Sequence, residues 1–563
     1  MKKTANLKTA FIALLVFFGM AGGVLIVQAK SANIPEQLTP TSIIDSKLPA
    51  LQPSYPKPQN PQPYKLVDPN ATVHQQTEDM LSTDTCLNLN DATYHNITAN
   101  TVICTDQGDY FYNGADMYGF INILADNITL DCQGAKIYSD NVPDSDPYTS
   151  TGGWGIIIGD PNHSYSNVTI KNCVIEKFYT DIYKYSNSNN TNIHNNSLIN
   201  SEIGLLSRGI ATNSHIYNNS LIGDGIFNDP NDQKIGILLE AENNGLFEYN
   251  TFTNLNYNGI LLNSKKLASI WYFPHDNIFR NNLMSNVYRG IVLTSGAYNN
   301  TIQDNQIDAS DVGIYFYHYT DPANKILNNT VIKNSVTGGS NNIGIMFEAS
   351  AGDNNTLKNN HLKNATAGRG LYLASGNNNN VILQNSFINN LHQAYDNGSG
   401  NIFDQNGKGN RWSTFDEPSE GCHDADGNGI CEESYTGITG DAGSIDHYPT
   451  TGQITLAPIN PITANELDTV IVDMAATDPE GDKLTYSIED PRFYSLESCV
   501  GDPSVWGWST NKYSAGHYFV MAKVTDGDYI ATQQAEIIVN DTCHLDKWGK
   551  MVCSAVRTNI SCL

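Results

Sequence analysis

Oxygen-bearing side chains stand at alternate positions in "DADGNGICEE", residues 424–433, a spacing that suits a bound metal ion. Hard cations such as Ca²⁺ take about six to eight oxygen ligands, and Gly429 permits the sharp turn that such a loop needs. The expected ligands are the side chains of Asp424, Asp426, Asn428 and Glu432 and the backbone carbonyl of Ile430. The sequence therefore predicts a structural calcium site in this loop.

The loop departs from the EF-hand pattern, because Tyr435 stands where the bidentate Glu would be. A plain acidic turn, closed by Cys422 and Cys431, is the alternative, and Asp446 would be a remote ligand. Farther along the chain lies a weaker acidic group, in turns of a kind that are usually only solvated. Its members are Asp478, Glu480, Asp482, Asp526 and Asp528.

Aromatic residues form a second candidate site. The segment from Asn263 to Asp276 and the segment "YHYTDPAN" from Tyr317 are expected on one edge of the molecule, about 10 Å apart. The predicted ligand-binding residues are Trp271, Tyr272, His275, Tyr298, Tyr317 and Tyr319, with Asp321 as a polar neighbour. Aromatic faces with a few fixed polar groups are typical of ligand sites. The alternative is that these aromatics pack loop against loop.

Asparagine-rich words recur at steps of roughly 21 to 32 residues, the range of solenoid repeats. In "NNTIQDNQI" from Asn299 and "NNTLKNNHL" from Asn354, apolar residues fall at fixed places around one aligned Asn. The aligned residues are Asn196, Asn219, Asn250, Asn282, Asn305, Asn329, Asn360, Asn385 and Asn406. A glycine such as Gly290 or Gly313 follows most of them by about eight to ten residues.

Between these turn-forming asparagines and glycines run alternating segments that are too short to be helices. They predict stacked coils of short strands, with asparagine amides bonded along the stack as in fibrillar Asn ladders. The regular apolar spacing argues against a prion-like disordered tract or simple compositional bias. Over about residues 86–450 the chain resembles the NosD-like right-handed parallel β-helix repeat proteins, which implies a pectin-lyase-like fold.

The expected fold class is all-β, a right-handed parallel β-helix followed by a small β-sandwich. The words "TDPEGDKLTY" and "AGHYFVMAKVTDG" resemble the cadherin-like or immunoglobulin-like modules of secreted proteins. The expected order is an export signal or N-terminal anchor (1–30), a Pro-rich linker (31–75), the β-helix (76–415), the acidic closing segment (416–455), the sandwich (456–541) and a cysteine-bearing tail (542–563).

The net charge of −27 and a pI near 4.7 disfavour nucleic acid or an anionic membrane as partner. Lysines precede an apolar run from Ala10 to Val27, as in an export signal. That run of about 18 residues is also just long enough to span a bilayer, so cleavage and retention as an anchor both remain open.

Ten cysteines on an exported chain predict disulfides. Three pairs are candidates: Cys86 with Cys104 around the N-terminal cap, which related proteins also suggest; Cys132 with Cys173, in similar words; and Cys422 with Cys431. Cys499, Cys543, Cys553 and Cys562 allow three connectivities. Most Asn-x-Ser/Thr sequons, such as those at Asn127, Asn167, Asn218, Asn299, Asn354 and Asn364, arise from the repeat words, and glycosylation is expected at a few exposed ones.

The resemblance also raises the question whether the chain is an enzyme, because β-helix enzymes mostly cut or epimerise polysaccharides. The outward carboxylates Glu240 and Glu348 would be four coils apart, on the order of 19 Å, whereas glycosidase pairs lie about 5 to 9.5 Å apart. A lyase base is expected only in the loop that holds Lys265, Lys266, His275, Asp276 and Arg280. Its "FPHD" word resembles the Asp-Pro-His word of alginate epimerases, but Phe273 replaces the acid.

These observations predict an exported cell-surface protein, structural or carbohydrate-binding, whose partner is an extracellular polysaccharide or surface glycan. A neutral or weakly charged glycan is expected, because an anionic chain would meet the negative field of the protein. The alternative is a polysaccharide lyase or glycoside hydrolase of the pectate-lyase-like superfamily. Calcium, bound by the acidic loop, is the expected cofactor. The 9 Met and 13 His are scattered and give no ligand set for the copper role associated with NosD.

Overall fold

A computed structural model of the chain describes residues 86–553, except 92–93, 113–118, 140–152, 161, 186, 226–233, 268, 320–323, 339–341, 453, 479–482, 527–528, 546 and 549–550. The export signal or anchor, the Pro-rich linker and the expected β-helix residues 76–85 lie outside the described residues. So do Asp321, Glu480, Asp482, Asp528 and Cys562. Within the described part, no helix is long and apolar enough to cross a membrane.

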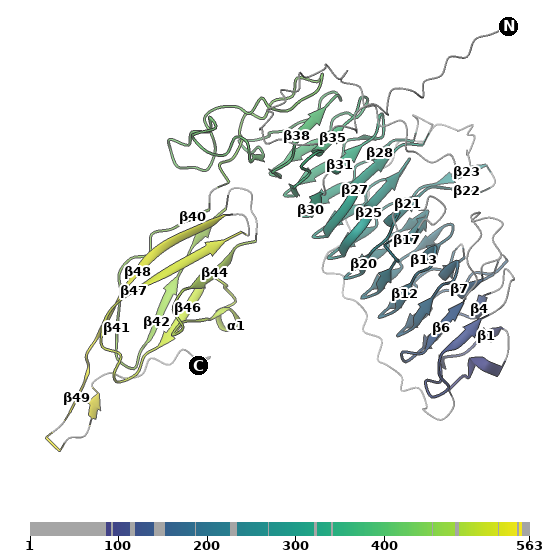
Figure 1. Cartoon of the computed structure of the whole chain (residues 1–563), viewed down its shortest axis with the longest axis horizontal. Helices are drawn as coiled ribbons and strands as arrows, with labels where there is room; N and C mark the ends of the chain where they lie inside the picture. Colours follow the sequence, from purple (N-terminus) through teal and green to yellow (C-terminus); the bar gives the residue numbers. More distant parts are fainter. Residues whose placement is uncertain are drawn as a thin grey trace, which may run out of the picture. The chain divides into compact units, whose positions relative to one another are not determined.

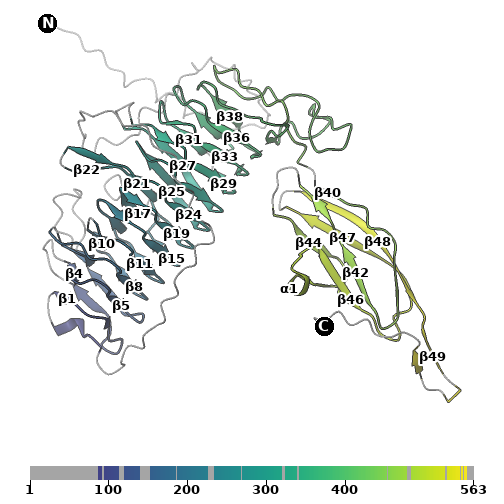
Figure 2. The same ribbon diagram turned by 180° about the vertical axis from the view of Figure 1, so that it is seen from behind.

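The predicted parallel β-helix is confirmed, with its coils stacked side by side from β1 to β39 (Figure 1). Nearly every coil contributes short strands to three rows, which we call rows A, B and C in chain order. Rows B and C join into one 22-stranded sheet because β25 and β27 run through both, while row A is an 11-stranded sheet, labelled most fully in Figure 2.

Row A consists of β2 (Thr101–Val102), β5 (Thr129–Asp131), β8 (Thr169–Lys171), β11 (Asn192–His194), β15 (His215–Tyr217), β19 (Leu246–Glu248), β24 (Ile278–Arg280), β26 (Thr301–Gln303), β29 (Thr330–Ile332), β33 (Thr356–Lys358) and β36 (Val381–Leu383). Row B consists of β3 (Tyr110–Tyr112), β6 (Lys136–Ser139), β9 (Val174–Glu176), β12 (Ser197–Ile199), β16 (Ser220–Ile222), β20 (Thr251–Thr253), the first parts of β25 (Leu283–Thr294) and β27 (Gln306–Tyr317), β30 (Ser335–Gly338), β34 (His361–Lys363), β37 (Ser386–Ile388) and β39 (Arg411–Trp412).

Row C consists of β1 (His95–Ile97), β4 (Gly119–Ile123), β7 (Trp154–Ile158), β10 (Thr180–Lys184), β13 (Ile203–Ser207), β17 (Ile235–Glu240), β21 (Asn258–Asn263), the last parts of β25 and β27, β31 (Ile343–Phe347), β35 (Arg369–Leu373) and β38 (His392–Asp396). Shorter elements at the turns are η1 (Leu89–Asp91) and the strand pairs β14 (Ala211–Thr212) with β18 (Glu242–Asn243), β22 (Lys265–Leu267) with β23 (Ile270–Tyr272), and β28 (Ile326–Leu327) with β32 (Gly352–Asp353).

Side chains alternate between the core and the outside, as the strand period requires. In row A the central residue of each three-residue strand points inward, so that Ile193 and Phe279 have no exposed surface. Identical or similar residues then stack coil on coil, as in the Phe316 and Phe347 rings, whose centroids lie 3.8 Å apart. One continuous hydrophobic core runs through the β-helix.

An asparagine ladder runs between rows A and B. The side-chain Nδ2 of Asn360 donates to Oδ1 of Asn385 in the next coil at 2.9 Å and to the backbone carbonyl of Val331 in the preceding coil at 2.9 Å. The Asn360 backbone N–H also donates to Oδ1 of Asn385. The same pattern repeats from rung to rung, so each rung amide donates to the Oδ1 of the next rung along the chain. The rungs are Asn196, Asn219, Asn250, Asn282, Asn305, Asn334, Asn360, Asn385 and Asn410.

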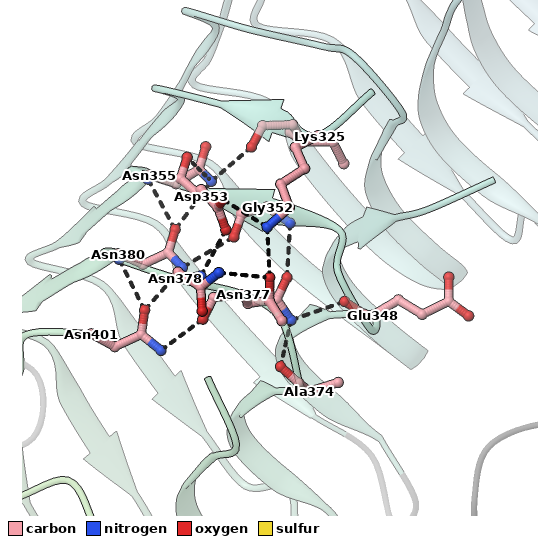
Figure 3. A network of polar contacts seen from close by, with 12 residues as sticks. Lys325, Glu348, Gly352, Asp353, Asn355, Ala374, Asn377, Asn378, Asn380 and Asn401 are labelled. Atoms are coloured by element: carbon pink, nitrogen blue, oxygen red, sulfur yellow. Dashed lines mark hydrogen bonds and ion pairs between the residues drawn. The ribbon is translucent and has the colours of Figure 1, made fainter. Parts of the chain in front are cut away.

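A second ladder with the same polarity precedes the strands of row A. Figure 3 shows its last rungs, where Asn355 donates to Asn380 and Asn380 to Asn401 at 3.1 Å each. Its rungs are Asn277, Asn300, Asn329, Asn355, Asn380 and Asn401. The predicted single ladder was therefore wrong at two positions: Asn329 belongs to this second ladder, and Asn406 is a turn residue with φ +56°.

The residue that makes the turn and the residue that forms the rung are different, adjacent residues. Left-handed φ angles fall on the residue before the rung, as at Asn328 (+56°), Asn354 (+59°) and Asn359 (+53°). Asparagine adopts this conformation more readily than most residues do, and its side chain remains outside the core. The repeated Asn-Asn pair is therefore a turn residue followed by a rung.

Both ladders end on carboxylates, one from the closing segment after β39 and the other from the end of β38. Asp446 Oδ2 accepts hydrogen bonds from the Asn410 backbone at 2.7 Å and from Trp412 Nε1 at 2.9 Å. Asp396 Oδ1 accepts from Nδ2 of Asn401 at 2.9 Å. An ionised acceptor opposite the N–H end of an aligned dipole column is electrostatically favourable, as it is at a helix N-terminus.

Two sheets that share a second hydrophobic core follow the β-helix, in agreement with the expected sandwich. One sheet has the order β41 (Ile462–Asn465), β48 (Ile530–Asn540), β47 (Gly516–Thr525) and β44 (Thr485–Ile488), and the other β42 (Thr469–Asp473), β46 (Val505–Ser509) and β45 (Tyr494–Ser495). The same part of the chain also contains β40 (Thr455–Leu456), β43 (Ala476–Thr477), α1 (Glu497–Val500) and the pair β49 (Cys543–Leu545) with β50 (Met551–Cys553). The cadherin-like or immunoglobulin-like assignment stays a prediction.

The three predicted disulfides are confirmed: Cys86–Cys104, Cys132–Cys173 and Cys422–Cys431. Cys173 precedes the first rung of the ladder between rows A and B, because its backbone N–H donates to Oδ1 of Asn196. The disulfide to Cys132 thus links coils where the ladder begins. In the tail, the backbones of Cys543 and Cys553 lie in register in the β49–β50 pair. Cys499, before β46, is disulfide-bonded.

Replacing a rung should destabilise the β-helix. We expect Asn360→Leu and Asn329→Leu, one from each ladder, each to lower the free energy of unfolding by about 1 to 3 kcal/mol, because buried amide and carbonyl groups of neighbouring coils lose their partners. Thermal or denaturant unfolding measures this change.

Asn192→Leu is the matched control, since Asn192 lies on the outer side of β11 and takes no part in either ladder. Rung variants that unfold at the same midpoint as Asn192→Leu would contradict the ladder account.

Candidate functional site

The outer side of row C carries an apolar strip that runs from coil to coil. The inward residues of this row, such as Ile260 and Phe316, have no exposed surface, as predicted. Their outward neighbours are also apolar and come into register along the stack: Leu238, Leu261, Val292, Tyr315, Met346, Tyr372 and Tyr395. A face of this kind differs from the polar outer side usual for a solvated sheet.

The outward strip is packed closely enough to form clusters of its own. Leu261, Val292, Tyr315 and Met346 retain only 3 to 6% of their surface, and the half-buried Tyr317 and Tyr372 border them. A second cluster at the N-terminal end includes Tyr183, over which Trp154 stacks at 4.6 Å between ring centroids. Burial raises the pKa of Tyr183 to about 12. Adjacent coils are about 4.8 Å apart, so these outward rings contact one another.

At the C-terminal end the strip is aromatic and cationic. The rings of Tyr372 and Tyr395 stack with centroids 5.0 Å apart, and the Arg369 guanidinium lies 5.1 Å from each. His392 is exposed and lies in register with Arg369. Cations over tyrosine faces are attracted by the ring quadrupole, so the two rings hold the guanidinium in place.

Arg289 occupies the same line of the row, three coils earlier. Its Nε donates to Asp311 Oδ2 at 2.7 Å, and its guanidinium lies 5.2 Å from the rings of Tyr288 and Tyr315 and 5.8 Å from that of Tyr257. Although burial opposes the charge, Asp311 raises the pKa of Arg289. This arginine is thus surrounded by three tyrosine rings, and Asp311 neutralises its charge.

The carboxylates of the face do not form a glycosidase pair. Glu240 ends β17 and Glu348 follows β31, four coils later in row C, on the order of 19 Å away. Lys265 Nζ pairs with Glu240 at 2.8 Å. Burial raises the pKa of Glu348, while the His318 backbone N–H opposes that shift. The separation exceeds the 5 to 9.5 Å that hydrolysis needs, roughly twofold.

The predicted aromatic residues lie on three different elements. The rings of His275 and Tyr298 stack at 4.6 Å in the turns before row A, and those of Tyr317 and Tyr319 meet edge to face at 4.8 Å at the end of β27. Trp271 and Tyr272 belong to the β22–β23 hairpin, where Lys266 Nζ lies 5.6 Å from the Trp271 ring. Four of the predicted residues thus form two ring pairs, and the expected role of the group in ligand binding stays a prediction.

Of the residues expected to supply a lyase base, Lys265, His275 and Arg280 take part in ion pairs, and Lys266 lies over the Trp271 ring. Arg280 donates to Glu248 at 2.7 Å, and His275 contacts Asp276 at 2.7 Å. Lys265 is held by Glu240, as described above. These contacts favour a structural role for the predicted base loop.

Sequence reasoning missed Arg289, Arg369, Tyr372 and Tyr395 as a functional group. The signal was present in the words "YRGIVL" and "GRGLYL", where an arginine precedes the glycine near the start of the row C strand. Only the glycine had been read as part of the repeat.

The acidic loop brings its carboxylates together. Ligand atoms of Asp424, Asp426 and Glu432 lie within 4.8 Å of one another. Asp424 accepts hydrogen bonds from the backbone N–H groups of Asn428 at 3.0 Å and Gly429 at 2.8 Å, so the loop winds around this side chain. The Cys422–Cys431 disulfide closes the loop.

Two neighbours of this loop have structural roles. Tyr435 is 7% exposed and stacks on Trp412 at 4.3 Å, so its ring belongs to the end of the core. Asp446 is fully buried as the carboxylate at the end of the first ladder, and burial raises its pKa to about 6 although the N–H groups of Asn410, Trp412 and Tyr448 lower it. Asp446 as a remote metal ligand was therefore wrong.

Neither cluster of His, Cys, Asp and Glu side chains among the described residues suits copper. Among them, one other group of three His, Cys, Asp or Glu side chains brings ligand atoms within 4.8 Å, namely Cys86, Cys104 and Asp106. Its two sulfurs form a disulfide. Copper prefers thiolate, thioether or imidazole ligands, which neither this group nor the acidic loop supplies.

Comparisons with known proteins give one family match. A model of the family described as periplasmic copper-binding protein (NosD) matches residues 218–417. A search of curated protein sequences found no match.

Several solved structures are similar at low identity. A mutant of the periplasmic alginate epimerase AlgG is 14% identical (TM-score 0.36; 50% of this chain, 65% of that chain). The DFA-IIIase from Arthrobacter chlorophenolicus A6 without its lid is 12% identical (TM-score 0.35; 52% and 71%). The Dettilon tailspike protein is 12% identical (TM-score 0.34; 78% and 85%). The chain thus spans just under two thirds of the epimerase's length.

Proposed function

We propose that this NosD-like β-helix protein binds an extracellular polysaccharide or surface glycan along the outer side of row C. The match to a periplasmic family and the three disulfides indicate an exported protein. The β-helix would serve as a rigid support for the binding face. We also propose that residues 1–30, where they are not cleaved, attach the protein to a membrane.

The observation that carries this proposal is the aromatic end of the outward strip. Tyr372 and Tyr395 are half-buried, stacked and fixed by Arg369, so they offer ring faces and edges that lose little conformational freedom on binding. Apolar surface with a few polar groups at its border is typical of ligand sites. A repeating face also suits a repeating ligand.

Binding is favoured over hydrolysis. The two outward glutamates of row C are too far apart to act on one glycosidic bond, and Glu240 is neutralised by Lys265. The second candidate function is a polysaccharide lyase or glycoside hydrolase, whose catalytic residues would have to be groups other than Glu240 and Glu348.

We also propose that the acidic loop binds Ca²⁺ as a structural ion. Asp424, Asp426 and Glu432 converge, and oxygen ligands of this kind suit a hard cation. The Asn428 side chain and the Ile430 carbonyl would complete the set. Because the loop lies in the closing segment, the ion would stabilise the end of the β-helix.

Removing the two tyrosine rings should strongly reduce the retention of the protein by polysaccharides. We expect a Tyr372→Ala, Tyr395→Ala variant to lose most of the binding of the wild type to immobilised polysaccharides, because each ring contributes apolar contact that alanine lacks. Affinity electrophoresis in gels that contain neutral or acidic polysaccharides measures the retardation.

A Trp271→Ala, Tyr272→Ala variant is the matched control, since it removes two aromatic rings from the β22–β23 hairpin. Retention that is lost in this variant and kept in the Tyr372, Tyr395 variant would move the site to the hairpin and refute the proposal for row C.

Calcium should raise the melting temperature relative to chelator, because a ligand that binds the folded state stabilises it. The increment should disappear in Asp424→Ala, Asp426→Ala, which differential scanning calorimetry would detect. An Asp526→Ala variant, altered in the sandwich, should keep it. If the double variant retains the full increment, the ion binds elsewhere.

A further inference from the structure

Arg369 carries a charge that the described residues leave unneutralised. Its Nε is buried and has no hydrogen-bond partner, and in the described part of the chain no carboxylate lies within ion-pair distance of it. Its contacts are the two tyrosine rings, each 5.1 Å from the guanidinium. Tyrosine rings orient a cation but do not accept its N–H groups as a carboxylate would.

The comparison with Arg289 shows what is missing. Arg289 pairs in register with Val312, and its acid, Asp311, is the residue just before Val312. Arg369 pairs in register with His392, and the residue just before His392 is Leu391, which is 59% exposed. At the position where one arginine finds its carboxylate, the other has an exposed leucine.

We infer that Arg369, with Tyr372, Tyr395 and His392, is a subsite for the carboxylate of an acidic sugar. The planar guanidinium matches a carboxylate in two parallel hydrogen bonds, and the missing acid of the chain leaves that position to a ligand. This inference rests on the proposed function, because the adjoining aromatic strip would hold the rest of the glycan.

The negative charge of the protein does not prevent this interaction. The net charge of −27 is spread over 563 residues, and salt at physiological strength screens charges beyond about 8 Å. A direct contact with one unneutralised guanidinium is screened much less. The structure therefore favours a uronate unit at this subsite over the neutral glycan expected from composition.

The test uses the purified full chain with trigalacturonate and its carboxyl-reduced counterpart as probes, at 0.15 M NaCl with chelator present so that calcium cannot bridge. Arg369→Gln removes the cation, and Leu391→Asp supplies the acid that Arg289 already has. Lys358→Gln, which removes a positive charge from row A, is the matched control. Titration calorimetry gives the Kd for each protein.

Both Arg369→Gln and Leu391→Asp should weaken trigalacturonate binding by about tenfold or more and leave the reduced probe unaffected, while Lys358→Gln binds like the wild type. Two independent variants keep the test valid if one fails to fold. Equal affinity of wild type and both variants for trigalacturonate would overturn the subsite. If the reduced probe still binds through Tyr372 and Tyr395, the glycan proposal survives that result; if the wild type binds neither probe nor any polysaccharide, both proposals fail.

Discussion

The head-to-tail hydrogen bond between asparagine amides of successive coils is the constraint on which the β-helix depends. Each rung bonds to the coil before it and the coil after it, so a slip of one residue in any strand would break both contacts and leave buried amides unpaired. Two such ladders border row A, and both end on aspartates of the C-terminal part of the fold. The closing segment is therefore part of the ladder system as well as a cover for the core.

Fixed register has a consequence for the outer surface. Since every coil begins its row C strand at the same place, outward side chains form straight lines, and small sequence differences along a line become local differences in chemistry. Arg289 and Arg369 illustrate this point, because they share a line and differ in whether the next coil provides Asp311 or Leu391. The same repeating backbone can in this way present an unneutralised arginine at the C-terminal end of row C and a neutralised one, Arg289, in its middle.

Much of the fold could be predicted from the sequence, because strand alternation and turn residues are local. Ile260 and Phe316 were expected to point inward and do. The assignment of Asn329 to the ladder between rows A and B was wrong, because turn and rung positions both hold asparagine and are adjacent in sequence. The sequence also does not show which asparagine of the next coil accepts a given amide hydrogen bond. The arginine–tyrosine group was missed for a related reason, since Arg369, Tyr372, His392 and Tyr395 come together only once the register between coils is known.

We propose that the register set by the ladders builds a glycan-binding face on row C. A crystal structure of the chain with a bound oligosaccharide would locate the sugar. We expect sugar density along the outward strip, over Tyr372 and Tyr395, with a ligand carboxylate at Arg369 when the sugar is a uronate. Density confined to row A, or to the β22–β23 hairpin, would contradict it.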